Sequence, residues 1–429
     1  MPAGLNSLFS RFRLDGEMMS GTLWMMLSYG VKLGLQLVSF VLLARELGAE
    51  SFGVYMALLS FVILLEPFFD LGAYHLVVDD ITGKVPTGAA IGNSIALSLM
   101  VFPIGMLAMY LGYLLIFDQV TYLMLFEVGL SQFIGGRTIS LTLGVNIAHG
   151  KMRRNAVLEM INGLIRLIVV SFLFLTGGGL EEWIHIQLAG NAVFALLVFF
   201  WWRRHWKLTV TGLTDIRRRL LAGMHFAIGN TARNANTEID KIMIYRFASV
   251  EGTGIYAAAT RFAVMSIVPV NALLSTVHRY FFIEGKKGYS ESRRYAKRML
   301  PITAAYGVFA AIVLYFFADL LIGLLGEDFR EAVDALHYLA VYPLILSIML
   351  PYGDALTGSS LQHVRARGTI YSMITNICLN LVLIPFFGWK GAIVATLISQ
   401  TLLMLFVTVY ASRYKGFIPE PRQQAESQA

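Results

Sequence analysis

Two cationic side chains, Lys32 and Arg233, stand inside stretches of the chain that are otherwise strongly apolar. They are equivalent positions of an internal repeat, because Arg45–Ala57 aligns without a gap with Arg246–Ala258 and the same offset pairs Lys32 with Arg233. A charge inside a hydrophobic span is costly and marks a functional site by default. Two cations at matching positions therefore predict a shared cavity that attracts an anion.

Further polar residues accompany both cations. Helical spacing places a set of them on one stripe of an otherwise apolar helix: Asn230, Arg233, Asn234, Thr237, Asp240 and Lys241. The stretch around Lys32 repeats the stripe more weakly, with Gln36 one turn further on. Such stripes face protein or water and not lipid tails. We expect them to line a hydrophilic cavity between the two halves of the chain, with Arg261 of the next stretch as a further candidate.

A purely structural interpretation of these charges remains open. Lys32 and Arg233 would then be neutralised by carboxylates such as Glu66, Asp70 or Asp240, because a buried ion pair can serve folding or specificity alone. Asp240 and Lys241 are adjacent and lie near one end of their span, so a structural or gating role is as consistent with their position as contact with a ligand.

Carboxylates inside the spans are candidates for ion coupling. Glu66 and Asp70 are spaced i and i+4 on one helix face, and such a pair can carry a proton or balance nearby cations. In a later stretch, the spacing of Glu159 and Arg166 favours an interaction within one bundle, since Met373 and Asn380 stand at the matching positions of the second half. Arg137 fits either a cavity or a structural role.

The composition is that of an integral membrane protein. Hydrophobic residues make up 57% of the 429 residues and charged residues only 14%, which is well beyond a soluble domain. Stretches long enough to cross a bilayer as helices recur throughout, so we predict an all-α fold with about twelve transmembrane spans. These are 20–44, 52–78, 88–117, 120–148, 155–176, 182–202, 221–247, 252–282, 298–325, 332–357, 368–387 and 390–412.

The spans divide into two equal sets. Six precede a basic segment and six follow it, so both halves share one orientation, related by an axis along the membrane normal. We predict two parallel six-helix lobes around a central cavity. The predicted divisions are a cytoplasmic N-terminal segment 1–19, an N-lobe 20–204, a basic cytoplasmic linker 205–219, a C-lobe 220–415 and a cytoplasmic tail 416–429.

The net charge of +7 reflects topology and not a nucleic-acid partner. Most of the 34 Lys and Arg residues lie in alternate connections, whereas the opposite connections carry only Arg45, Arg246, Arg330 and Lys390. This asymmetry follows the positive-inside rule and predicts that both termini are cytoplasmic. Cys378 is alone and the eight histidines show no ligand spacing, so neither a metal site nor a cofactor is predicted.

Several segments now resemble a known family. The run Leu42–Tyr55, followed by Asp70–Gly72, resembles the opening of bacterial polysaccharide flippases. Further similar segments are Asp240–Met243, Gly254–Tyr256, Arg261–Phe262, Asn376–Pro385 and Gly388–Ala392, so that the resemblance covers nearly the whole chain. That family belongs to the multidrug/oligosaccharidyl-lipid/polysaccharide exporter superfamily, with the lipid II flippases and the multidrug and toxin extrusion transporters.

The resemblance implies a V-shaped cavity between the lobes and a transporter, not an enzyme. It implies alternating access that moves an undecaprenyl-diphosphate-linked oligosaccharide from the cytoplasmic to the periplasmic leaflet of a bacterial inner membrane, alongside polysaccharide polymerase machinery. Lys32, Arg233 and Arg261 would then attract the diphosphate as charge-assisted donors. The sugar would be met by amides, namely Gln36, Asn230, Asn234 and Asn271. The lipid tail would remain among the membrane lipids.

Two other functions stay open at this point. A cation-coupled small-molecule antiporter of the multidrug type shares the architecture, but it calls for a net acidic cavity, and the repeat contributes cations instead. A membrane enzyme acting on the same lipid-linked glycan calls for a sizeable loop over the reacting sugar, whereas the predicted periplasmic connections are short.

Overall fold

The computed structural model describes residues 16–210 and 216–413, and every regular element in these ranges is a helix. The first half comprises α2 (Gly16–Asp70), α3 (Ala73–Thr82), α4 (Thr87–Ile116), α5 (Tyr122–Ala148), α6 (Met152–Thr176) and α7 (Leu180–His205). The second half comprises α8 (Ile216–Phe247), α9 (Val250–Met265), α10 (Val268–Lys286), α11 (Tyr289–Phe316), α12 (Ala318–Gly323), the 3₁₀ helix η2 (Glu327–Phe329), α13 (Ala332–Leu339), α14 (Tyr342–Gly358), α15 (Gln362–Phe387) and α16 (Trp389–Arg413). The all-α prediction is confirmed.

Nine helical segments within the described ranges are long and apolar enough to cross a membrane. The segment 30–82 holds two spans, because α2 folds back at Gly48, whose φ of 67° and ψ of 173° interrupt the helix. Two further helices, α5 and α8, have the length of a span but carry more polar residues than the other spans. Together they complete the twelve spans that the sequence predicts for a multi-pass membrane protein.

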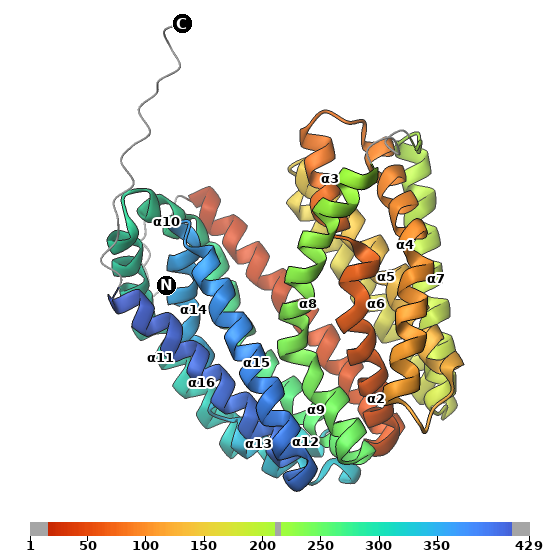
Figure 1. Cartoon of the computed structure of the whole chain (residues 1–429), viewed down its shortest axis with the longest axis vertical. Coiled ribbons are helices and arrows are strands. Elements are labelled where there is room, and N and C mark those ends of the chain that lie inside the picture. The colour runs from red at the N-terminus through yellow and green to blue at the C-terminus, as the bar shows by residue number, and fades with distance from the viewer. Residues whose placement is uncertain (1–15, 211–215, 414–429) are drawn as a thin grey trace, which may run out of the picture.

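The spans form two lobes that converge at one end of the molecule. Figure 1 shows α4–α7 in one bundle and α10, α11 and α14–α16 in the other, with α9, α12 and α13 at the converging end and the bundles diverging toward the opposite end. The two-lobed architecture is therefore confirmed.

The backbones of the two halves are in direct contact where the lobes converge. A Cβ atom added to Gly53 would lie 2.1 Å from the Val250 carbonyl oxygen, and one added to Gly254 would lie 2.0 Å from the Ala49 carbonyl oxygen. Gly53 and Gly254 are equivalent positions of the repeat, and so are Ala49 and Val250. The two halves thus contact each other through matching turns, and only glycine fits at the centre of this contact.

Aromatic side chains from both halves surround this contact. The Phe40 ring lies 5.8 Å from Phe52 of the same helix and 5.6 Å from Phe262 of α9, and both pairs are edge-to-face. Phe52 in turn meets Phe329 of η2 at 5.8 Å. Edge-to-face pairs of this kind add about 0.5–1.5 kcal/mol each beyond the burial of their surface. The converging end is therefore a packed core shared by both lobes.

The predicted linker and the predicted terminal segments can be compared with the structure only in part. Of the linker 205–219, residues 211–215 lie outside the described residues, while 216–219 already belong to α8. The N-terminal segment lies outside them except for 16–19, which begin α2, and so does the tail 416–429.

Candidate functional site

Helix α8 passes from one lobe to the other, which places its polar stripe between them. Its first turns lie on the N-lobe: Arg219 forms an ion pair of 2.8 Å with Asp80 of α3, and a Cβ added to Gly223 would lie 2.6 Å from the Leu71 carbonyl oxygen. Its later turns lie on the C-lobe, where Asp240 meets Asn380 of α15. Helix α8, which carries the predicted stripe, therefore runs along the border between the lobes (Figure 1).

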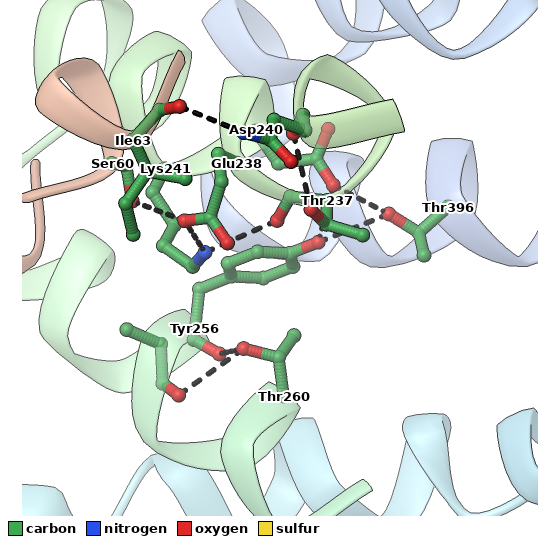
Figure 2. A network of polar contacts seen from close by, with 11 residues as sticks. Ser60, Ile63, Thr237, Glu238, Asp240, Lys241, Tyr256, Thr260 and Thr396 are labelled. Carbon is green, nitrogen blue, oxygen red and sulfur yellow. Dashed lines mark hydrogen bonds and ion pairs between the residues drawn. The ribbon is translucent and has the colours of Figure 1, made fainter. Parts of the chain in front are cut away.

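A network of polar contacts ties α8 to α2 across this border. Asn234 donates to the carbonyl oxygen of Ile63 at 2.8 Å, and the Ser60 hydroxyl donates to the Glu238 carboxylate at 2.7 Å. Lys241 completes the network with an ion pair of 2.5 Å to the same carboxylate (Figure 2). The charge of Lys241 is thus balanced within α8, one turn away. Glu238, the acceptor at the centre, is a residue that the sequence analysis did not single out.

The stripe continues from this network to exposed residues. Thr237 and Arg233 are exposed and lie one and two turns before Lys241 on α8, with Asn230 partly buried beyond them. No ion pair joins Arg233 to any carboxylate of the described residues. Arg233 therefore keeps an unbalanced positive charge next to the contact between the lobes.

Lys32, its equivalent in the first half, is in a different position. Its ammonium group forms an ion pair with Glu159 of α6, and both side chains are about one-third exposed, at 33% and 31%. The interaction predicted between Glu159 and Arg166 is therefore wrong, because Lys32 takes up the Glu159 carboxylate. Gln36, one turn after Lys32, is partly buried, and Asn271 of α10 is exposed.

Without an ion pair to Glu159, Arg166 joins Arg261 in a second cationic site, of which the sequence predicted only Arg261. Arg261 of α9 lies near Arg166 of α6 and near Glu238 of α8, and the Glu238 carboxylate already binds Lys241 and Ser60. The Nε atom of Arg261 is buried without a hydrogen-bond partner. Two guanidinium groups from different lobes thus lie near each other, and neither forms an ion pair with a carboxylate of the described residues, an arrangement that suits binding of an anion.

Arg166 also faces a polar pocket inside the N-lobe. The pocket lies between α5, α6 and α7 and has a volume of about 110 Å³, enough for a few water molecules. Uncharged polar side chains line it together with Arg166, namely Gln132, Asn162, Gln187 and Asn191. Trp183 also lines the pocket, and its indole N–H is buried without a hydrogen-bond partner. Spacing along the sequence could not reveal this pocket, because its donors come from three helices.

The two carboxylates of the second span lie in different surroundings. Asp70 binds Arg137 of α5 at 2.9 Å and also accepts from the Ala73 backbone N–H at the start of α3. Arg137 donates in addition to the carbonyl oxygens of Asp70 and Ser94. This pair therefore fixes the break between α2 and α3. Glu66 approaches Gly136 and has no ion-pair partner among the described residues.

A third cluster surrounds Asp240 in the C-lobe. This carboxylate is 2% exposed and accepts hydrogen bonds from Tyr256 at 2.6 Å, from Asn380 at 2.5 Å and from Thr396 at 2.8 Å. Figure 2 shows the Tyr256 and Thr396 hydroxyls beside it. No Lys, Arg or His of the described residues lies within ion-pair distance of Asp240. A buried carboxylate without a cationic partner is costly unless it takes up a proton or a cation.

Two helical lobes joined at one end, with unbalanced charges along their border, define a multi-pass membrane transporter. A model of the polysaccharide biosynthesis protein family matches residues 18–278, more than half of the chain. The chain belongs to this family.

Two curated relatives from the archaeon Haloferax volcanii are similar over most of the chain. The probable low-salt glycan biosynthesis flippase Agl15 is 23% identical over 402 residues, 89% of this chain and 80% of its own. The probable flippase AglR is 24% identical over 384 residues, 83% of this chain and 76% of its own. Both relatives are described as probable flippases.

Solved structures share the fold at low sequence identity. The lipid II flippase MurJ in an inward closed conformation superimposes with a TM-score of 0.75 at 12% identity, covering 91% of this chain and 87% of its own. An inward-facing MATE family multidrug transporter gives 0.70 at 13% identity, over 89% and 94% of the two chains. An outward-facing MATE transporter gives 0.59 over 92% and 94%.

Proposed function

We propose that this protein flips an undecaprenyl-diphosphate-linked oligosaccharide from the cytoplasmic to the periplasmic leaflet of a bacterial inner membrane, for surface polysaccharide synthesis. The observation that carries the proposal is that Arg166 of one lobe lies near Arg261 of the other, while neither of them, nor Arg233 of α8, forms an ion pair with a carboxylate of the described residues. A diphosphate supplies the missing negative charge. The family and the two archaeal flippases support a lipid-linked glycan as the cargo.

Each part of the cargo has matching chemistry. Arg166 and Arg261 present guanidinium groups from opposite lobes, and a diphosphate between them would accept charge-assisted hydrogen bonds from both. Thr237, Asn230 and Asn271 offer hydrogen bonds to the sugar, and the polyprenyl tail stays in the bilayer. Because the two arginines belong to different lobes, release follows when the lobes rearrange and separate them.

The leaflet distribution of undecaprenyl-diphosphate-linked glycans in cells lacking this gene tests the proposal. We expect accumulation on the cytoplasmic side, relieved by the wild type and not by Arg233→Ala, because an unpaired cation next to the border is lost. Lys32→Met should impair flipping through the orphaned Glu159, and Lys32→Met/Glu159→Gln should restore it. If the double variant did not restore flipping, Lys32 would be needed for more than neutralising Glu159, as expected of a cation that binds the cargo.

Absence of any accumulation would contradict the flippase and favour an antiporter or an enzyme of lipid-linked glycans. The same assay in proteoliposomes, with undecaprenyl-diphosphate-linked and other polyprenyl-diphosphate-linked glycans, separates the carrier from the function. If only glycans on the other polyprenyl carriers were flipped, the flippase function would be supported and undecaprenyl diphosphate would be excluded as the carrier.

We also propose Asp240 as the site where a coupling cation or proton acts. Its buried carboxylate is held by three neutral donors, so one positive charge can be taken up without breaking an ion pair. Ion-driven flipping by Asp240→Asn in proteoliposomes should lose its response to an imposed sodium or proton gradient, since coupling free energies are typically worth a factor of about 5 to 150. The matched control is Asp319→Asn, an exposed carboxylate on α12.

An Asp240→Asn variant that still responds to the gradient like the control would eliminate Asp240 as the coupling site. Glu66, a partly buried carboxylate of the second span that also has no ion-pair partner among the described residues, would then be tested by Glu66→Gln. Asp70 is the weaker candidate because Arg137 already balances it.

A further inference from the structure

The N-lobe carries a large groove to which the other lobe contributes no lining residue. It has a volume of about 560 Å³ and is formed by three neighbouring helices of one lobe, α5, α6 and α7. Its lining residues are Thr142, Asn146, Arg153, Arg154, Val157, Leu158, Ile161, Phe194, Leu197, Val198 and Trp201. Because every one of them belongs to the N-lobe, the groove keeps its shape when the lobes move against each other.

The groove is amphiphilic along its length. Arg153 and Arg154, both exposed, stand in the first turn of α6, and Val157 and Ile161 follow one and two turns further into the span. On the opposite wall Leu197 is 60% exposed, and Trp201 lies one turn before the end of α7. Tryptophan is enriched at the level of lipid headgroups. The groove thus offers positive charge at the membrane interface and apolar surface deeper in the membrane. An anionic lipid has a negative headgroup and acyl chains at the same two levels.

A polar group inside the groove narrows the identity of that lipid. The Asn146 side chain lines the groove, is only 3% exposed, and has no hydrogen-bond partner among the described residues. The amide atoms are not fully buried but open into the groove, where a ligand oxygen can accept a hydrogen bond from them. Below its phosphate, a glycerophospholipid has glycerol-backbone oxygens that accept such a hydrogen bond. A polyprenyl diphosphate has only hydrocarbon there.

We propose that this groove, formed by α5, α6 and α7, is a binding site for one anionic glycerophospholipid of the bilayer. Its phosphate lies between Arg153 and Arg154, a backbone oxygen accepts from the Asn146 amide, and an acyl chain packs along Val157, Ile161 and Leu197. Basic pockets between transmembrane helices at the cytoplasmic side recognise acidic headgroups by this chemistry. The site is separate from the cationic border between the lobes and does not depend on the proposed cargo.

Native mass spectrometry of the full chain, released from phosphatidylcholine nanodiscs that contain phosphatidylglycerol, tests this site. The wild type should retain one phosphatidylglycerol molecule. Arg153→Gln/Arg154→Gln should lower that retention about tenfold, since each basic residue at a membrane surface adds to the affinity for acidic lipids. The matched control is Arg203→Gln/Arg204→Gln, a second exposed basic pair that ends α7 and does not line the groove. It should retain the lipid as the wild type does.

Two uncharged changes separate the groove from general surface charge. Asn146→Leu should lower retention several-fold, and Leu197→Trp should abolish it by filling the groove from an exposed position where folding is unaffected. Equal loss in both arginine pairs, or full retention in Leu197→Trp, would overturn the proposal. Displacement of phosphatidylglycerol by undecaprenyl phosphate in the wild type would also overturn it, because the groove would then belong to the cargo lipid.

Discussion

Replacing Gly254 by alanine is expected to drive the lobes apart at their converging end. The new Cβ would lie 2.0 Å from the Ala49 carbonyl oxygen. The atoms nearest to it all belong to the backbone, so the clash cannot be relieved by moving a flexible side chain. Overpacking of a tight contact costs about 1–3 kcal/mol. We therefore expect the population with this end closed to fall by a factor of about 5 to 150.

The change in population can be measured by the distance between spin labels on the two lobes. In a Cys378→Ala background, labels at Arg204→Cys of α7 and Arg294→Cys of α11 occupy exposed positions on different lobes. If the lobes move as rigid bodies, opening one end brings the diverging ends closer, so Gly254→Ala should shift the distance distribution to shorter values. Gly53→Ala, the equivalent position of the repeat, should do the same.

Gly229→Ala is the matched control, because the position lies in α8 and has no neighbouring atom within 4 Å of an added Cβ. Alanine there should leave the distances unchanged and stabilise the helix by about 0.5–1 kcal/mol. If Gly254→Ala gave the same distances and the same flipping rate as Gly229→Ala, the glycine contact would not hold the converging end together.

The sequence predicted the architecture well because membrane spans follow from length and apolarity alone. The internal repeat also identified Gly53 and Gly254 as equivalent, and the structure shows these positions packed against each other. The repeat could not show that these two equivalent glycines would also lie in contact with each other in the folded protein. That contact depends on how the two lobes converge, which no local pattern encodes.

The candidate site was harder to predict because the two halves differ in their charges. Lys32 and Arg233 are equivalent, but Glu159 binds Lys32 whereas its counterpart Met373 cannot bind Arg233. The same comparison places Arg166 in the first half where Asn380 binds Asp240 in the second. One half therefore contributes a free cation and the other a buried carboxylate. The two halves share a fold but carry different charged residues at equivalent positions. The role of a charged residue in one half therefore could not be predicted from its equivalent in the other.

Arg261→Gln and Arg166→Gln should have the largest effect on transport. A hydrogen bond to a charged group is worth about 1.5–3 kcal/mol, so each change should weaken binding of the diphosphate about 10- to 100-fold. Arg261 carries the stronger expectation, because its Nε atom is buried without a partner and a bound phosphate oxygen would satisfy it. Binding of an undecaprenyl-diphosphate glycan to the purified protein and its flipping in proteoliposomes are the measurements.

Lysine at either position should restore part of the binding, because it returns the charge but not the two-pronged geometry of the guanidinium group. Arg294→Gln makes the same chemical change at an exposed surface pair with Glu291 and should leave binding intact. Cargo binding by both glutamine variants at the level of Arg294→Gln would show that the two arginines serve the fold alone. Because Arg166 and Arg261 come from opposite lobes, the double variant should cost less than the two single losses together if one diphosphate bridges them.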